Sequence, residues 1–219
     1  MGCLLLGSVL AQTAPSQDQV QTYRGLLAAA ASGDVKAIQF LIQSGAQLDI
    51  RDEQERTPLL VAAHFGHLEA ARALLAGKAN PNAFDWQRYD LITIAAVRND
   101  LPMLRLGLRA GASAKNITSP YQGTALIAAA HLGYVQVVKL LLEANAPRDH
   151  INNLGWTALL EAIILGDGGS RHTEVVRLLL AAGANWRIAD RNGVTPLEHA
   201  KRRGYIQMRQ LLESVAKSL

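Results

Sequence analysis

A short phrase recurs along this chain at a nearly constant interval, and this repetition constrains the fold more than any other feature of the sequence. Its fullest copy runs from Thr57 to His67 and reads TPLLVAAHFGH. Partial copies begin at Thr124, Thr157 and Thr195. A fixed period of this kind predicts an array of stacked structural units rather than a single layered domain.

The positions equivalent to Thr57 define six units. They are Arg24, Thr57, Asp90, Thr124, Thr157 and Thr195, and the steps between them are 33, 33, 34, 33 and 38 residues. The last step is longer because residues 167–172 add a glycine-rich stretch, which we expect to lengthen the turn between two helices. Insertions in repeat arrays map to loops on one face.

Each unit carries the signals of two short helices. Thr57 can cap a first helix with its hydroxyl, and Pro58 occupies the first helical position, where a missing N–H costs nothing. Gly66 ends this helix, because glycine accepts the left-handed backbone of a helix stop. A second helix with an apolar stripe follows, as at Val138 and Leu141. One unit cannot bury such a stripe alone, so neighbouring units are expected to stack.

The 33-residue period and the phrase that starts at Thr57 resemble the ankyrin repeat. The stretches Lys78 to Asp85 and Gly183 to Asn185 are similar to the segment that joins units in that family, and Gly155-Trp156-Thr157 is similar to its G-x-T-P motif. The resemblance covers residues 20 to 216. It implies an all-α solenoid of about six helix-turn-helix repeats with short hairpin-like fingers, a fold that usually binds other proteins.

The expected boundaries follow from the period. Residues 1–19 are assigned to a signal-peptide remnant and a short linker, and residues 20–219 to one ankyrin repeat domain. The six repeats are expected at 20–51, 52–84, 85–117, 118–151, 152–189 and 190–219. The first and last depart from the phrase, for example at Gly25 and Lys201, as is typical of terminal units.

An apolar run from Cys3 to Leu10 precedes the repeats, and Val9 and Ala11 satisfy the small-residue rule for cleavage after Ala11. We therefore expect export to the bacterial periplasm, with the cytoplasm as the alternative. The run lacks a basic segment before it and is too short to span a bilayer, which takes about twenty residues. Cleavage would remove Cys3, the only cysteine, which suits an oxidising compartment.

Composition narrows the classes of partner. The net charge is +4, and it is dispersed, with Arg202-Arg203 as the densest basic spot. A nucleic-acid surface normally shows a stronger and clustered basic patch. We expect no nucleic-acid partner, no membrane association beyond the N-terminal signal, and a monomer.

No motif places a catalytic, cofactor or metal site. His64 and His67 are three residues apart, but the Gly66 helix stop lies between them, and no serine stands in a nucleophile elbow. The glycine-rich stretch from Gly166 has no preceding strand and lacks the lysine of a phosphate loop. We expect a protein that is not an enzyme and holds no cofactor or metal. A hydrolase that uses residues 167–172, with Asp167 and His172, is the alternative from another class.

The resemblance implies a concave binding face made of finger tips and the ends of first helices, and several aromatics of this aromatic-poor chain fall there. Trp, Tyr and Arg carry most interface energy. The predicted partner-binding residues are Phe65, Trp86, Arg88, Tyr89, Arg98, Tyr121, His131 and Trp156. Arg56 is also expected at a finger position. The alternative is that the aromatics pack finger against finger and stiffen the array, as we expect for Trp186.

The predicted function is binding of another protein by a periplasmic accessory or protective factor. An immunity-type inhibitor of a toxin or enzyme is the alternative within the binding class. The dispersed charge favours the accessory, because an inhibitor is expected to show one dominant charged patch. A passive structural role is the third possibility.

Overall fold

A computed structural model describes residues 12–217, and these residues form thirteen α-helices and no β-strand apart from one isolated bridge between Thr118 and Gly123. The predicted signal peptide over residues 1–11 lies outside the described residues. The chain divides into two compact units, unit 1 ending at Ser113 and unit 2 beginning at Ala114. This boundary falls inside the third predicted repeat.

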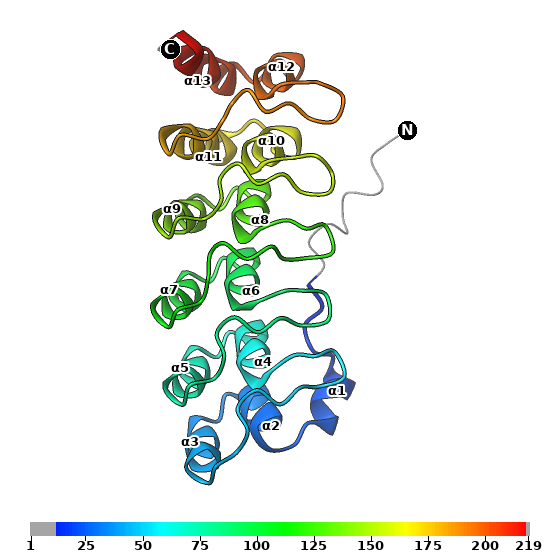
Figure 1. Cartoon of the computed structure of the whole chain (residues 1–219), viewed down its shortest axis with the longest axis vertical. Helices are drawn as coiled ribbons and strands as arrows, with labels where there is room; N and C mark the ends of the chain where they lie inside the picture. Colours follow the sequence, from blue (N-terminus) through cyan, green and yellow to red (C-terminus); the bar gives the residue numbers. More distant parts are fainter. Residues whose placement is uncertain (1–11, 218–219) are drawn as a thin grey trace. The chain divides into compact units, whose positions relative to one another are not determined.

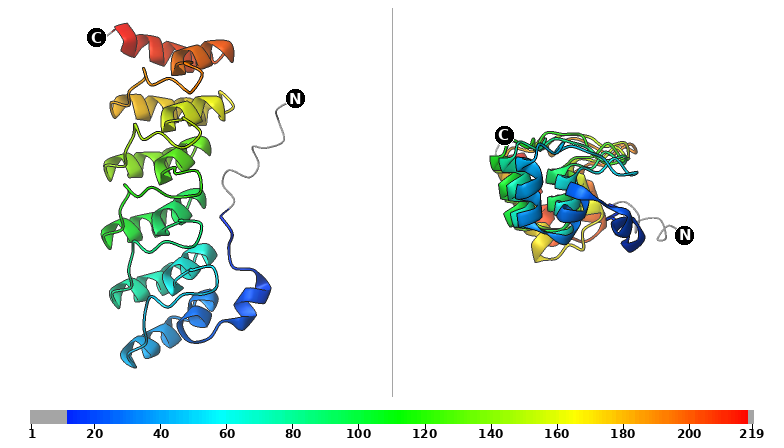
Figure 2. Two further views of the ribbon diagram at one scale, coloured as in Figure 1. Left: turned by 45° about the vertical axis from the view of Figure 1, so that its right-hand side comes forward. Right: turned by 90° about the horizontal axis from the view of Figure 1, so that it is seen from below.

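Unit 1 holds seven helices. They are α1 (Gln17–Thr22), α2 (Gly25–Ser32), α3 (Val35–Gln43), α4 (Pro58–Phe65), α5 (Leu68–Ala76), α6 (Leu91–Val97) and α7 (Leu101–Arg109). Helices α2, α4 and α6 pack in an inner row, and α3, α5 and α7 pack in an outer row (Figure 1). The end view in Figure 2 shows the two rows side by side, with α1 apart from both.

Unit 2 holds six helices in the same arrangement. They are α8 (Ala125–His131), α9 (Val135–Glu143), α10 (Ala158–Ile164), α11 (Ser170–Ala181), α12 (Pro196–Arg202) and α13 (Ile206–Lys217). Helices α8, α10 and α12 form the inner row, and α9, α11 and α13 form the outer row. The predicted all-α fold of paired helices is confirmed.

Local chemistry explains where the inner helices begin. The side chains of Thr57 and Thr157 accept hydrogen bonds from the backbone N–H groups of Leu60 and Leu160. Asp90, which stands where the other units have threonine, caps α6 in the same way at 2.8 Å. Each cap satisfies a backbone donor that the helix itself cannot pair.

Small side chains let the inner rows pack closely. The alanine pairs of the repeated phrase are buried, as are the leucines of the outer helices that face them. In unit 1, Ala62 on α4 and Leu74 on α5 have no exposed surface, and in unit 2 the same holds for Ala129 on α8 and Leu141 on α9. The core of each unit is therefore the seam between its two rows.

Two features differ from the sequence-based expectations. Helix α1 forms within and just beyond the expected linker, and it lies beside the inner row of unit 1, on the side away from α3 and α5 (Figure 1). The insertion at 167–172 lengthens more than a turn, because Ser170 to His172 belong to α11. Helix α11 has 12 residues where α9 has nine, so the insertion adds helix as well as loop.

Candidate functional site

Four of the fingers are tight turns, each organised by the Asp or Asn side chain that begins it. Asp85 Oδ1 accepts hydrogen bonds from the backbone N–H groups of Gln87 and Tyr89, at 3.0 and 2.8 Å. The same two bonds recur at Asp52, Asn152 and Asp190. Side chains of Asp and Asn stabilise turns in this way. The repeated turn fixes which finger residues point outward and which point into the unit.

Trp86 is the most exposed aromatic side chain among the fingers of unit 1. Its side chain is 55% exposed, although its backbone N–H is held by the carbonyl of Gln54 on the preceding finger at 3.0 Å. Arg88 is also exposed, and its guanidinium lies 4.9 Å from the centre of the Phe84 ring. An exposed indole beside an exposed guanidinium on a fixed turn is suited to contact with another protein.

The other predicted residues of unit 1 divide into two groups. Arg98 is exposed at the end of α6, and Phe65 is half-buried at the end of α4. Tyr89 is only 2% exposed, so its side chain belongs to the interior and cannot contact a partner. Burial removes the large apolar surface of the Tyr89 ring from water, so this side chain stabilises the unit itself.

Arg56, expected at a finger position, is 1% exposed. Its Nε donates to Asp52 Oδ2 at 2.7 Å, its Nη1 to the carbonyl of Thr13 at 3.0 Å, and its Nη2 to Gln19 Oε1 at 2.9 Å. A buried guanidinium needs such acceptors because an unpaired buried charge is very costly. Arg56 therefore links the second repeat to residues 12–22.

Asp52 and Tyr23 complete this buried polar cluster. The Tyr23 hydroxyl donates to Asp52 Oδ2 at 2.5 Å. Burial alone would raise the pKa of Asp52, but the hydrogen bonds from Tyr23 and Arg56 outweigh it and hold this pKa below its ordinary value. Burial, together with the bond to Asp52, raises the pKa of Tyr23 far above its ordinary value. Asp52 is thus an anion and Tyr23 a neutral donor at neutral pH.

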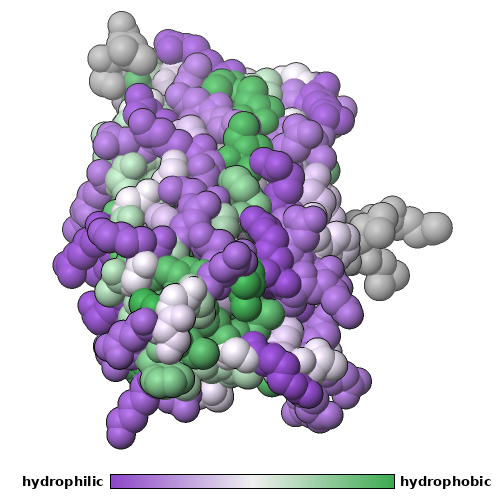
Figure 3. Space-filling view, turned by 60° about the horizontal axis from the view of Figure 1, so that its bottom comes forward, coloured by the Kyte–Doolittle hydropathy of each residue, from purple (hydrophilic) through white to green (hydrophobic). Residues whose placement is uncertain are grey.

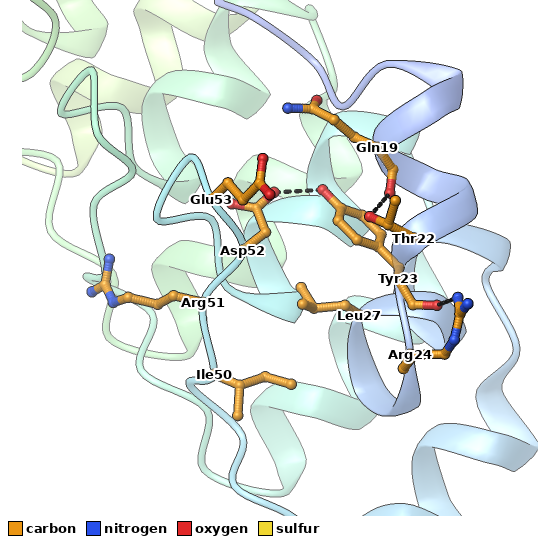
Figure 4. Close-up of a pocket in the computed structure, with 9 residues that line it drawn as sticks. All are labelled: Gln19, Thr22, Tyr23, Arg24, Leu27, Ile50, Arg51, Asp52 and Glu53. Atoms are coloured by element: carbon orange, nitrogen blue, oxygen red, sulfur yellow. Dashed lines mark hydrogen bonds between the residues drawn. The ribbon is translucent and has the colours of Figure 1, made fainter.

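A cleft of about 370 Å³ lies beside this cluster (Figure 4). Its walls come from α1, from the start of α2 and from the first finger, and its lining residues are Gln19, Thr22, Tyr23, Arg24, Leu27, Ile50, Arg51, Asp52 and Glu53. One nitrogen of each arginine is bound to a carbonyl, since Arg24 Nη1 donates to that of Tyr23 and Arg51 Nη1 to that of Phe84. Both side chains are exposed at the edge of the cleft.

In unit 2 the predicted residues are less exposed. Tyr121, His131 and Trp156 are all half-buried. The backbone of Tyr121 is engaged, because its carbonyl accepts the N–H of Asn153 on the next finger at 3.0 Å. The structure brings Tyr121 and Asn153 together at adjacent fingers, and it places His131 at the end of α8.

His131 contacts a buried carboxylate that the sequence analysis did not single out. Glu161 is 1% exposed; its Oε1 accepts from the Asn152 side chain at 2.9 Å, and its Oε2 lies 3.4 Å from His131 Nδ1. A signal was present in the sequence, because Glu161 stands in the first-helix phrase where Val61 and Ile94 stand in other units. A buried carboxylate at a position that is apolar in other units needs polar partners, which Asn152 and His131 supply.

The lengthened turn in the fifth repeat does not assemble a catalytic pair. His172 Nδ1 lies 2.8 Å from Asp167 Oδ1, and its Nε2 lies 2.9 Å from the carbonyl of His131. Both ring nitrogens are therefore engaged, and neither is free to accept a proton from a substrate. His67 in unit 1 makes the equivalent bond to the carbonyl of Ala31, so this contact belongs to the repeat architecture.

Two properties of the described part of the chain bear on function. Within residues 12–217, no group of three or more His, Cys, Asp or Glu side chains is placed to hold a metal ion. None of the helices described there combines the length and apolar character needed to cross a membrane.

Comparison with known proteins identifies the class of protein that this fold defines. The model for ankyrin repeats in three copies matches residues 91–190, and a second ankyrin repeat model matches residues 26–75. The chain belongs to the ankyrin repeat family.

Particular relatives support this membership. The chain is 33% identical to the ankyrin repeat protein YahD of Escherichia coli (strain K12), over 85% of this chain and 92% of YahD. An ankyrin repeat domain from Acinetobacter baumannii AYE is 43% identical with a TM-score of 0.84, covering 87% of this chain and 97% of that domain. The ankyrin repeat protein EF0377 is 31% identical with a TM-score of 0.79, covering 88% and 98%.

Proposed function

We propose that this protein binds another protein through its finger tips and the exposed ends of its inner helices. The observation that carries the proposal is Trp86, whose indole is 55% exposed although its backbone is fixed to the neighbouring finger. A turn whose backbone is already ordered loses little conformational entropy on binding. Arg88 and Arg98 add exposed guanidinium groups in the same unit. Tyr89 is left out, because it is buried.

In unit 2 the proposed surface includes Tyr121, His131 and Trp156. These side chains are half-buried, so each packs partly against the protein and keeps part of its surface for a partner. Hot-spot residues at interfaces are usually held in this way by their neighbours.

We also propose that the protein acts as an accessory or protective factor in the bacterial periplasm. The apolar run from Cys3 to Leu10 supports export, and the dispersed net charge of +4 supports an accessory over an immunity-type inhibitor. Amino-terminal sequencing of protein recovered from a periplasmic fraction tests the compartment. A mature chain that starts at Gln12 is expected, and an intact amino terminus in the cytoplasmic fraction would contradict export.

Affinity capture from an envelope extract tests the binding proposal. The Trp86→Ala variant is expected to bind the partner at least tenfold more weakly and to capture correspondingly less of it. Truncating a central aromatic at an interface commonly costs over about 1.4 kcal/mol of binding free energy. Phe40→Ala is the matched control, since Phe40 is also an exposed aromatic, at 68%, but lies on α3 in the outer row. Equal capture by both variants and the unmodified chain would show that the fingers of unit 1 do not bind the partner.

The identity of the captured protein separates the two versions of this function. An enzyme whose activity is unchanged or protected in the complex fits the accessory. An enzyme or toxin whose activity is blocked fits the immunity-type inhibitor.

A further inference from the structure

Residues 12–23, which we call the N-terminal strap, lie against the inner row of unit 1. The strap comprises an extended stretch from Gln12, the short helix α1, and Tyr23. It lies beside α2 and α4, on the side of the unit that the outer row leaves uncovered (Figure 1). Inner-helix ends on this side include Phe65, one of the residues proposed to contact a partner.

Arg56 is the main polar anchor of the strap. Of the three acceptors around its buried guanidinium, the Thr13 carbonyl and Gln19 Oε1 belong to the strap, and only Asp52 belongs to the repeats. Gln19 Oε1 also accepts the backbone N–H of Ser16 and so closes the capping box of α1. One amide oxygen therefore holds both the helix and its attachment to the inner row.

The strap also covers apolar surface of the inner row. Pro15 is buried, and Pro15 and Val20 line a hollow of about 290 Å³ together with Ala31 and Phe65. The covered surface thus combines the guanidinium of Arg56 with an apolar wall, which together suit a bound peptide.

The strap has few buried residues between its two attachment points. Pro15 and Tyr23 are buried, but none of the six residues of helix α1 is. Helices this short are not stable alone, and segments with few buried apolar contacts open without global unfolding. The cleft of Figure 4 lies along one edge of the strap, and the hollow beside Phe65 lies along another. The strap therefore packs incompletely against unit 1. Gly25, with φ at 55° and open space around it, gives the chain a pivot directly after the strap.

We propose that the inner-row side of unit 1 is a peptide-binding groove, that the strap is its built-in occupant, and that an extended segment of the partner protein replaces the strap. The incoming segment supplies two oxygen acceptors to Arg56 and an apolar side chain beside Phe65, as Thr13, Gln19 and Pro15 do in the closed state. The inference rests on the proposed protein binding, and it adds the location on unit 1 and the chemistry of the bound segment.

The test uses the full chain and a synthetic peptide of residues 12–23, acetylated, amidated and fluorescently labelled, as the probe. The double substitution Ser16→Ala/Gln19→Ala loosens the strap, because it removes the capping box and one acceptor of Arg56. This variant is expected to bind the peptide about tenfold more tightly than the unmodified chain, since a larger fraction of its grooves is open. Hydrogen exchange in residues 12–23 should increase, while α4 keeps its protection.

Two matched controls make the result specific. Gln43→Ala/Ser44→Ala removes the same residue types from an exposed site at the end of α3 and is expected to bind the peptide as the unmodified chain does. A peptide in which the residue equivalent to Gln19 is alanine is expected to lose most of its binding, and this change leaves the folding of the protein untouched. The proposal would be overturned by any of three results. These are equal affinity for the two peptides, equal affinity of the three chains for the unmodified peptide, or unchanged hydrogen exchange in residues 12–23 of the loosened chain.

The two proposals can fail separately. Loss of capture in Trp86→Ala together with no peptide binding by the loosened chain would leave the protein-binding function standing and refute the groove. Peptide binding by the loosened chain without any capture that depends on Trp86 would support the groove and refute the finger surface.

Discussion

His64 and Asp85 are two buried ionisable side chains of unit 1 whose titrations oppose each other. Burial, with help from the nearby charges of Arg56 and Arg98, lowers the pKa of His64 from 6.5 to about 4. Burial raises the pKa of Asp85 from 3.8 to about 6, against the two backbone hydrogen bonds of its turn. Between about pH 4 and 6, folding therefore releases a proton from His64 and takes one up at Asp85, and their effects on stability cancel.

Single substitutions should reveal each titration alone. In Asp85→Asn, His64 remains, and the free energy of unfolding relative to the unmodified chain should increase as pH rises from 4 to 6. In His64→Gln, Asp85 remains, and the free energy of unfolding relative to the unmodified chain should decrease as pH rises from 4 to 6. The slopes have an upper limit of about 1.4 kcal/mol per pH unit. Urea denaturation at a series of pH values measures both, and parallel profiles for all three chains would contradict the assignment.

At the scale of single residues, the fingers of unit 1 also carry backbone strain. Glu55 and Arg88 have φ values of 57° and 64°, at the finger position that Gly155 and Gly193 occupy in unit 2. Residues with a Cβ are strained there, by about 1–2 kcal/mol. Glycine relieves the strain but adds entropy to the unfolded chain.

We expect Glu55→Gly to raise the free energy of unfolding by about 0.5–1 kcal/mol, the strain relieved less the entropy added. The ion pair that it removes, between Glu55 and Arg51 at 3.8 Å, is exposed and contributes little. Gly193→Ala is the reverse control, because an added Cβ there meets no atom within 4 Å and only φ is unfavourable. Thermal unfolding of both variants checks the prediction, which requires the melting temperature to rise in Glu55→Gly and to fall in Gly193→Ala.

At the scale of elements, the lengthened turn of the fifth repeat packs against the last repeat. The Tyr205 hydroxyl, just before α13, donates to the carbonyl of Gly166 at 2.9 Å. A Cβ on Gly168 would lie 2.4 Å from the Tyr205 ring, so the turn and the ring lie in direct contact. Gly166 and Gly168 thus join two neighbouring repeats of unit 2.

This contact predicts different costs for two adjacent glycines. Gly168→Ala should lower the free energy of unfolding by about 1–3 kcal/mol, because φ is 73° and the new methyl clashes with Tyr205. Gly169→Ala should cost well under 1 kcal/mol, since its nearest neighbours are the flexible side-chain atoms of Asp167 at 3.1 Å or more and its φ of −73° suits any residue. Urea denaturation of the two variants compares them, and equal costs would contradict the packing role.

The elements predicted from sequence share one property: their signals are local. The caps at Thr57 and Asp90 act over three residues, and the apolar stripes repeat within one helix. Arg56 and the strap could not be predicted in this way, because Thr13 and Gln19 lie 43 and 37 residues from Arg56. An arginine next to acidic residues indicates an exposed position by composition, and only long-range acceptors make its burial favourable.

The candidate surface shows the same division. The local pattern places Trp86 and Tyr89 on one finger, but it does not distinguish the residue that is 55% exposed, Trp86, from the one that is 2% exposed, Tyr89. The pairing of His131 with Glu161 joins two inner helices, so neither repeat alone contains it. Positions within a repeat are therefore more predictable than contacts between repeats.

At the scale of the whole molecule, stability is shared among neighbouring repeats. In repeat proteins each repeat contacts only its neighbours, so the free energy of unfolding is approximately a sum of local terms. The end of unit 1 formed by α2 and α3 has neighbours on one side only, and an apolar area is visible there (Figure 3). On α3, Phe40 is 68% exposed whereas Ile38 is fully buried.

A substitution at this end should therefore act locally. Ile38→Ala is expected to cost about 2–5 kcal/mol through the cavity it leaves, and hydrogen exchange should accelerate in α2 and α3, less in α4 and α5, and not in unit 2. Phe40→Ala, on the same helix, should change the free energy of unfolding by less than about 0.5 kcal/mol, because little of the ring is buried. Hydrogen exchange measured peptide by peptide distinguishes this gradient from a uniform acceleration along the chain. A uniform acceleration would contradict the prediction and show that the molecule unfolds as one cooperative body.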